Sequence, residues 1–310
     1  DSYTFDIRNQ LGKMIKLVYC FMSLHNKIME LNVQTVKKIV SSQFPHYANH
    51  EISMVYKSGH DNRTFHLGNE FSLRFPSAIE YSTQVLKEHQ FCSILQSQLS
   101  VQITEPFHLG KPSDLYPFHF SINKWIEGES INHNCDKKRL AYDCAKFLLE
   151  LKACDTINGI EAGEHNFYRG GNLSVYHEET LKAIHDCTEF DQEKCYKIWN
   201  KGITSTFHGP NSWIHGDFEK DNILVKNGRL HAVIDFGNMA VGDPACDYVM
   251  AWTYFDEASR EIFLKTLNID NACIARAKAW ALWKALITLS DPKRRETSLY
   301  TLNEIFKEDI

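Results

Sequence analysis

The alternation of apolar and polar positions divides this chain into a strand-rich first part and a helix-rich second part. Apolar residues recur at helical spacing over 33–44 and again over 79–99. The remaining apolar runs of the first part are short and bounded by turn residues, which predicts strands. The predicted strands are 51–57, 63–67, 71–75, 101–103 and 118–125. We therefore expect a small sheet of five strands, with one helix inserted after the third.

The second part reads as helical, apart from two polar loops. Helical spacing predicts helices over 137–153, 176–200, 245–266, 271–290 and 296–308. An irregular, glycine-containing insertion occupies 155–175. A chain of 310 residues suits two lobes that share a cleft. We place the first lobe at 31–125, a linker at 126–130 and the helical lobe at 131–310.

Residues 1–30 form a separate N-terminal extension in this scheme. Apolar positions from Leu11 to Met22 predict an extra helix packed on the first lobe. Lys13 and Lys16 interrupt any signal-peptide or membrane-spanning pattern, so no membrane partner is expected, with a role at a membrane surface as the alternative.

Composition and charge narrow the class of protein. The apolar fraction is 43% and the charged fraction 24%, as in soluble globular proteins. A net charge of −5 argues against nucleic acid as the partner. Nine cysteines without a C-x-x-C pair indicate reduced thiols rather than a disulfide framework. We therefore expect a cytoplasmic protein, either monomer or dimer.

Two neighbouring motifs carry the candidate chemistry. Residues 213–225 read WIHGDFEKDNILV, and residues 233–237 read VIDFG. They place Asp217, Asn222 and Asp235 on short loops beside apolar strands. A carboxylate there can orient and deprotonate an attacking hydroxyl, and amide and carboxylate oxygens suit Mg²⁺ together with phosphates. The order H-x-D-x-x-x-x-N, strand, I-D-F-G matches the catalytic and metal loops of kinases.

Further residues in and after these motifs are typical of one protein family. Gly216 stands where protein kinases carry Arg, and residues 242–247 read GDPACD. With these motifs the chain resembles the aminoglycoside phosphotransferase family over roughly residues 31 to 300. The resemblance implies an α+β, bilobal, protein-kinase-like fold with a small five-stranded antiparallel sheet and a larger, mainly helical lobe. It also implies transfer of the γ-phosphoryl group of ATP or GTP to a hydroxyl of a small molecule. The leading acceptor is an aminoglycoside-type antibiotic, with antibiotic resistance as the outcome.

The resemblance assigns roles to the motif residues. Asp217 is the expected base, and Asn222 and Asp235 hold Mg²⁺. His215 braces the loop, and Lys220 is a candidate contact for the transferring phosphate, although it lies one residue beyond the position of such a lysine in protein kinases. The alternatives are an Asp that only caps a helix, or a metal hydrolase using His215 and Asp217. Asp243 and Asp247 are expected to be mainly structural, with Asp247 opening a helix.

Nucleotide contacts are expected in the first lobe. The candidates are Ser58, Gly59, His60, Arg74, Glu88, Asn123 and Trp125. The turn at 58–60 would cover the phosphates, and the strand 121–125 would contact the base through its backbone. Arg74 replaces the strand-three lysine of kinases and is expected to pair with Glu88. The alternative is an ordinary surface ion pair.

The charged side chains of residues 155–200 bear on the identity of the acceptor. Residues 155–200 contain nine acidic and four basic side chains, which would attract a polyamine such as an aminoglycoside. Solvated helix faces would produce the same count. Arg169 suits an acceptor bearing an anion or hydroxyls better than a polycation. The rival functions are a kinase of choline, a sugar or an amino alcohol, and a nucleotide-binding module without turnover.

Overall fold

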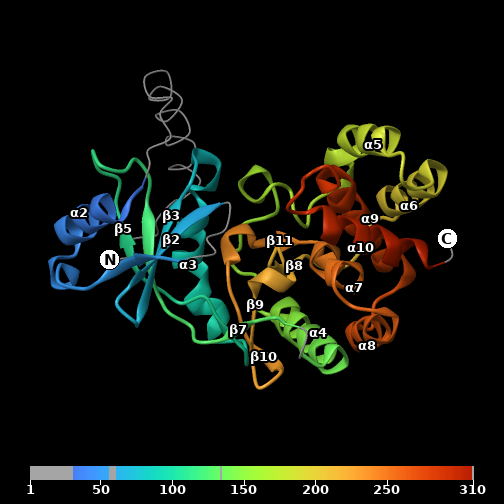
Figure 1. Ribbon diagram of the computed structural model, residues 1–310. Helices are drawn as coiled ribbons and strands as arrows, with labels where there is room; N and C mark the ends of the chain where they lie inside the picture. Colours follow the sequence, from blue (N-terminus) through green and yellow to red (C-terminus); the bar gives the residue numbers. More distant parts are fainter. Residues whose placement is uncertain (1–30, 56–60, 133–134, 309–310) are drawn as a thin grey trace.

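The protein folds into a sheet-containing lobe and a larger helical lobe, as the computed structural model shows for residues 31–55, 61–132 and 135–308 (Figure 1). The predicted helix of residues 1–30 lies outside these described residues. The predicted fold class, α+β with two lobes, is confirmed. In the described residues, no helix is long and apolar enough to cross a membrane.

The first lobe is built on an antiparallel sheet. Within the described residues it has five strands in the order β1-β2-β3-β6-β5. The strands are β1 (Ile52–Met54), β2 (Asn62–Leu67), β3 (Phe71–Pro76), β5 (Pro106–Gly110) and β6 (Phe120–Lys124). Helices α2 (Val33–Gln43) and α3 (Gln84–Gln96) accompany it. Phe75 stacks on Phe120 across β3 and β6, with ring centroids 4.5 Å apart, so the sheet has a tightly packed aromatic centre.

The identity of the fifth strand differs from the prediction. Strand β4 (Gln102–Ile103) lies where a strand was expected, but it pairs in parallel with β10 of the second lobe. Residues 106–110, which were not predicted, complete the first sheet as β5. A two-residue strand gives the same local signal whichever sheet contains it, so only the tertiary fold decides its partner. Helix α3 also starts later than expected, after a 3-10 turn at Ile79–Tyr81.

Two small sheets carry the loops of the second lobe. One has the order β4-β10-β9-β7, and the other pairs β11 with β8. Their strands are β7 (Glu129–Ser130), β8 (Ser212–Ile214), β9 (Ile223–Lys226), β10 (Arg229–Val233) and β11 (Ala240–Gly242). Strand β7 falls within the predicted linker 126–130, so the linker is partly incorporated into the second lobe.

Helices make up most of the second lobe, and the one predicted at 137–153 is confirmed. The helices are α4 (Lys137–Ala153), α5 (His177–Asp186), α6 (Gln192–Thr204), α7 (Met250–Thr253), α8 (Glu257–Leu267), α9 (Asn271–Thr288) and α10 (Arg295–Phe306). The single helix predicted over 176–200 is wrong. Asp191 accepts a hydrogen bond from the Lys194 backbone N–H and so caps a new helix, α6.

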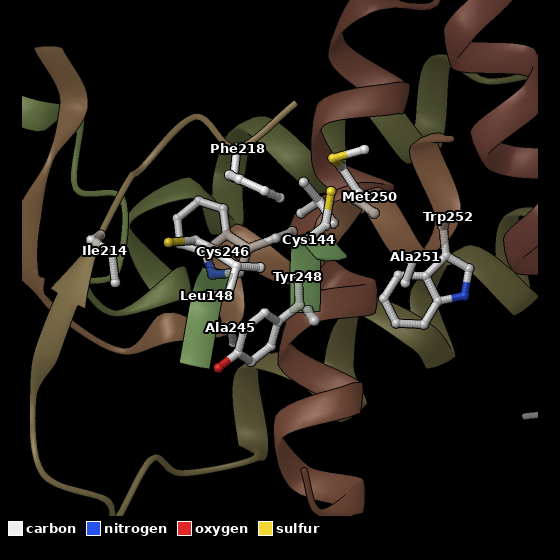
Figure 2. Packing of buried hydrophobic residues seen from close by; sticks show 14 of the residues in the cluster. Cys144, Leu148, Ile214, Phe218, Ala245, Cys246, Tyr248, Met250, Ala251 and Trp252 are labelled. Carbon is white, nitrogen blue, oxygen red and sulfur yellow. The ribbon is translucent and has the colours of Figure 1, made fainter. Parts of the chain in front are cut away.

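Buried side chains anchor the segment that carries the first motif. All three residues of β8 are buried, and Phe218 stacks on Phe147 of α4 at 5.7 Å. Figure 2 shows Ile214 and Phe218 among other buried side chains of this cluster, including Leu148 of α4. The residues between Ile214 and Phe218 are therefore held at both ends by the core. Among the described cysteines none is in a disulfide, and all but Cys135 are buried.

Candidate active site

The loop after β8 is shaped by hydrogen bonds to its own histidine. The backbone N–H of Asp217 donates to Nδ1 of His215 at 3.2 Å. Nε2 of the same ring lies 3.0 Å from the carbonyl oxygen of Ile234, to which it donates. These two bonds require the tautomer with its proton on Nε2. His215 is fully buried and connects the loop of the first motif to that of the second, as a bracing role predicts.

The side chain of Asn222 is hydrogen-bonded to Asp217. Its Nδ2 donates to the Asp217 carbonyl oxygen at 2.9 Å and to Oδ2 at 3.3 Å. The carbonyl oxygen of Asn222 accepts a bond from the Ile234 N–H at 2.9 Å. Asn222 is thus tied by hydrogen bonds to Asp217 and to the residue before Asp235. The structure brings together the three residues that the motif spacing singled out.

Asp247 fixes the backbone of the same loop, a contact that was not predicted. Its two carboxylate oxygens accept bonds from the N–H groups of His215, at 2.6 Å, and Gly216, at 2.8 Å. Burial raises the pKa of Asp247 to about 6, against the opposing effect of His215 and these two bonds. Asp247 does not open a helix as expected. It lies inside the 3-10 helix Pro244–Val249, which Asp243 caps.

Asp235 takes part in a buried charge cluster that joins the lobes. Nη2 of Arg74 lies 2.6 Å from its Oδ1, and Nη1 of Arg74 lies 2.6 Å from Oε1 of Glu88. Arg74 is 8% exposed and Glu88 0%, so the alternative of a surface ion pair is wrong. The Asp235 backbone has φ +64° and donates its N–H to Oγ1 of Thr104 at 3.0 Å. Thr104 lies between β4 and β5, and no motif pointed to it.

In this cluster burial and ion pairing shift the pKa of each group in opposite directions. Burial alone raises the pKa of Asp235, but the adjacent Arg74 guanidinium outweighs it and leaves the pKa lowered. Burial likewise lowers the pKa of Arg74, and the Asp235 and Glu88 carboxylates more than reverse this effect. For Glu88 burial dominates, so its pKa stays raised despite Arg74. Arg74 is therefore cationic at every accessible pH and Asp235 is held as an anion.

The other predicted nucleotide contacts are less well supported by the fold. Ser58, Gly59 and His60 lie outside the described residues. Asn123 lies in β6, which has neighbours on both sides. The Trp125 backbone N–H donates to the Glu70 carbonyl oxygen at 2.7 Å. The Trp125 N–H is therefore used within the first lobe and is not available to a base.

Lys87, next to Glu88 in α3, reaches into the second lobe. Its Nζ lies 3.0 Å from His165 Nδ1, 3.2 Å from the His165 carbonyl oxygen and 3.3 Å from the Met239 carbonyl oxygen. Burial lowers the pKa of Lys87 to about 7. His165 belongs to the insertion 155–175, so a buried, weakly basic amine holds that insertion against the first lobe.

A pocket lies beside Asp217, on the side of the helical lobe. Arg169 from the insertion, Glu219 and Lys284 line it with charged groups. The full lining is Arg169, Gly216, Asp217, Phe218, Glu219, Cys246, Val249, Thr253, Trp280, Ala281 and Lys284. None of the nine carboxylates of 155–200 is among these residues, and all nine are exposed. The acidic count of that segment therefore reflects solvated surfaces, one of the two alternatives.

A two-lobed fold with an H-x-D-x-x-x-x-N loop and an I-D-F-G loop at the lobe boundary defines a kinase-like phosphotransferase. The chain matches the phosphotransferase enzyme family, APH, over residues 54–284. This match spans more than half of the chain, so the protein belongs to that family. The predicted resemblance is confirmed.

Individual relatives share parts of the sequence and most of the fold. An aminoglycoside 3'-phosphotransferase of Escherichia coli is 30% identical over 95 residues, which are 28% of this chain and 35% of the relative. The GDP complex of wild-type aminoglycoside 2'-phosphotransferase-IIIa has a TM-score of 0.70 at 20% identity, covering 89% of this chain and 98% of that one. The macrolide 2'-phosphotransferase MphH of Brachybacterium faecium has a TM-score of 0.60 at 18% identity, covering 87% and 98%. These structures are similar in fold.

Proposed function

We propose that this protein transfers the γ-phosphoryl group of ATP or GTP to a hydroxyl of a small molecule. The observation that carries the proposal is the joined network at the lobe boundary. Asn222 bonds to Asp217, and the Asn222 carbonyl oxygen accepts the N–H of the residue before Asp235. Arg74 and Glu88 connect Asp235 to the first lobe. A nucleotide-binding module without turnover has no chemical need for the base and the metal ligands together.

In this proposal Asp217 orients the acceptor hydroxyl and takes its proton late in the transfer. A bond forms between the acceptor oxygen and the γ-phosphorus, and the bond to the bridging oxygen breaks, releasing ADP or GDP. Because the transition state is loose, positioning and charge neutralisation matter more than a strong base. His215 braces the loop. The side chain of Lys220, which forms no hydrogen bond or ion pair with any described residue, is available for the transferring phosphate.

The residues present fit Mg²⁺. One oxygen of Asp235 bonds to Arg74, which leaves the other for a cation. Asn222 bonds to Asp217 through Nδ2, so its Oδ1 remains an oxygen donor. A magnesium ion held by one carboxylate, one amide oxygen and phosphates is a usual arrangement. When bound, it neutralises the negative charge of the nucleotide phosphates.

The names of the relatives suggest an aminoglycoside-type antibiotic as acceptor, with resistance as the outcome. A metabolite kinase acting on choline, a sugar or an amino alcohol is the second candidate. The pocket beside Asp217 bears on this choice, because Arg169 and Lys284 in its lining disfavour cationic acceptors, which include aminoglycosides, choline and amino alcohols, but not a sugar. Growth of cells expressing the protein on aminoglycoside plates separates the two candidates. We propose a cytoplasmic protein, in keeping with the free thiols of all the cysteines that the structure describes.

The test is magnesium-dependent nucleotide consumption by the full chain in the presence of aminoglycosides, choline, sugars and hydroxy acids. Asp217→Asn should abolish turnover while nucleotide affinity stays nearly unchanged. Asp221→Asn is the matched control, since Asp221 is an exposed carboxylate four residues along the same segment. Loss of turnover in both variants, or in neither, contradicts the role of Asp217.

A further inference from the structure

Two cationic side chains in the pocket beside Asp217 form no ion pair with a carboxylate of the described residues. Neither the guanidinium of Arg169 nor the ammonium of Lys284 makes a hydrogen bond or ion pair with any described residue. Two buried arginines of the same lobe are paired with carboxylates. Arg276 lies 2.6 Å from Asp243, and Arg260 lies 3.1 Å from Glu304. The pocket cations thus differ from the structural cations around them.

Charges of both signs lie close together in this pocket. Burial, and then the neighbouring Arg169, lower the pKa of Lys284, and Glu219 and Asp217 oppose this without reversing it. Burial, and then Asp217, raise the pKa of Glu219, and Lys284 and Arg169 oppose this without reversing it. Both charged forms are therefore destabilised in the free protein, and a ligand anion beside the two cations would relieve the first of these effects. Functional sites accumulate such unfavourable charge arrangements more often than structural regions do.

Arg169 is also held in place before any ligand binds. Its guanidinium lies over the rings of Trp283, at 4.6 Å, and Trp280, at 5.4 Å. Its backbone carbonyl accepts a bond of 2.8 Å from Nδ2 of Asn166, which is fully buried. Trp283 is itself fixed by a 2.7 Å bond from Nε1 to Glu179. A stacked guanidinium keeps its N–H donors free for an anion and loses little freedom on binding.

We propose that Arg169 and Lys284 bind an anionic group of the acceptor, a carboxylate or a phosphate, while the acceptor's hydroxyl faces Asp217. The acceptor is then a small hydroxy acid or a hydroxylated phosphate ester. The two cations and the two carboxylates of the lining cancel formally, so the pocket has no excess negative charge to attract a polycation. This inference rests on the proposed phosphotransferase function and specifies its substrate class.

The first experiment compares acceptors that differ only in charge. Gluconate, glucitol and glucamine share a six-carbon polyol skeleton and are anionic, neutral and cationic at one end. Glycerate, glycerol and glycerol 3-phosphate form a second set that distinguishes a carboxylate from a phosphate. We expect the anionic members to have the lowest KM in nucleotide-consumption assays. Equal or better turnover of neutral or cationic members overturns the inference and leaves the phosphotransferase proposal intact.

Substitution of Arg169 and Lys284 tests whether these two cations cause the preference for anionic acceptors. Arg169→Gln and Lys284→Gln should each raise the KM of an anionic acceptor by about tenfold to a hundredfold. This is the loss of affinity expected when one hydrogen bond to a charged group is removed. The kcat, and the KM of a neutral acceptor, should change little. Lys182→Gln is the control, because Lys182 is an exposed lysine of the nearby α5. A fall in kcat with every acceptor would place these cations at the transferring phosphoryl group and refute the inference.

A binding assay separates failure of this inference from failure of the proposed function. In the Asp217→Asn variant with Mg²⁺ and ADP, tryptophan fluorescence should respond to gluconate, glycerate or glycerol 3-phosphate, because Arg169 stacks on Trp280 and Trp283. The response should disappear when Arg169→Gln is added. Binding without turnover in the wild type would support the anion site and contradict the phosphotransferase proposal. No preference for anions in either assay overturns the anion site.

Discussion

Replacing Arg74 by Met should be among the most damaging single substitutions in the site. The change removes the cation that lies 2.6 Å from both Glu88 and Asp235 and keeps much of the side-chain volume. Glu88 is 0% exposed, so after the substitution its carboxylate has neither water nor a counter-ion. Breaking a buried ion pair from one side costs about 3–5 kcal/mol, mainly through the uncompensated charge that remains.

The free energy of unfolding, measured by urea denaturation at constant temperature, tests this magnitude. Arg295→Met is the matched control. Arg295 lies 2.6 Å from Glu189, but both side chains are over 40% exposed, so its loss should cost at most about 1 kcal/mol. The double variant Arg74→Met with Glu88→Gln should recover part of the stability, because it removes the stranded charge. Equal losses for Arg74→Met and Arg295→Met, or no recovery in the double variant, would refute the reasoning.

Three further substitutions probe other contacts. Asp235→Asn should weaken magnesium-dependent nucleotide binding by about tenfold or more, since Mg²⁺ loses its charged ligand; calorimetric titration at several Mg²⁺ concentrations measures this. Lys87→Met should flatten the pH dependence of stability above pH 7. Folding lowers the pKa of Lys87 from its ordinary value of 10.5 to about 7. Between these two pH values the amine carries a proton in the unfolded chain but not in the folded one. The free energy of unfolding of the wild type therefore rises by about 1.4 kcal/mol per pH unit in this range because of Lys87. Gly216→Ala should reduce both stability and turnover, since a Cβ at φ +80° would lie 2.2 Å from the Asn238 carbonyl oxygen.

Two control variants test the physical causes assigned to the effects of Gly216→Ala and Lys87→Met. Gly228 has φ +71° and nothing within 4 Å of an added Cβ, so Gly228→Ala should cost only the backbone strain of about 1–2 kcal/mol. Gly216→Ala should exceed it by the cost of overpacking, about 1–3 kcal/mol. Lys138 is exposed, and Lys138→Met should leave the pH profile of stability unchanged. Identical losses for the two glycine variants, or a wild-type slope that persists in Lys87→Met, would contradict these explanations.

Local patterns in the sequence were sufficient for the family and for the centre of the site. The short hairpin β9–β10 brings Asn222 and Asp235 together, and Asp217 lies five residues before Asn222, so the proximity of the three residues is already present in the sequence. Helix α4 was predicted to the residue, because its apolar stripe is continuous and Asp136, which caps it, directly precedes it. The Arg74–Glu88 contact was predicted from the resemblance, which supplies a spatial relation that spacing alone does not.

Contacts between distant segments could not be predicted in this way. Asp247 reaches back 32 residues to the His215 N–H, and Thr104 reaches 131 residues forward to Asp235. An aspartate or a threonine has the same local signature whether it caps its own helix or bonds to a remote loop. The exchange of β4 for β5 in the first sheet has the same origin, since a short strand carries no information about its partner.

The sequence by itself therefore determined the fold class, the family and the three motif residues, because these depend on periodicity and short spacings. Only the tertiary structure decided which charges are buried together. It placed Arg169 and Lys284, 115 residues apart in the chain, in one pocket beside Asp217, where neither forms an ion pair with a described residue. It left the nine carboxylates of 155–200 exposed to solvent. Net charge counts residues, whereas recognition depends on where each charge lies relative to the reacting group.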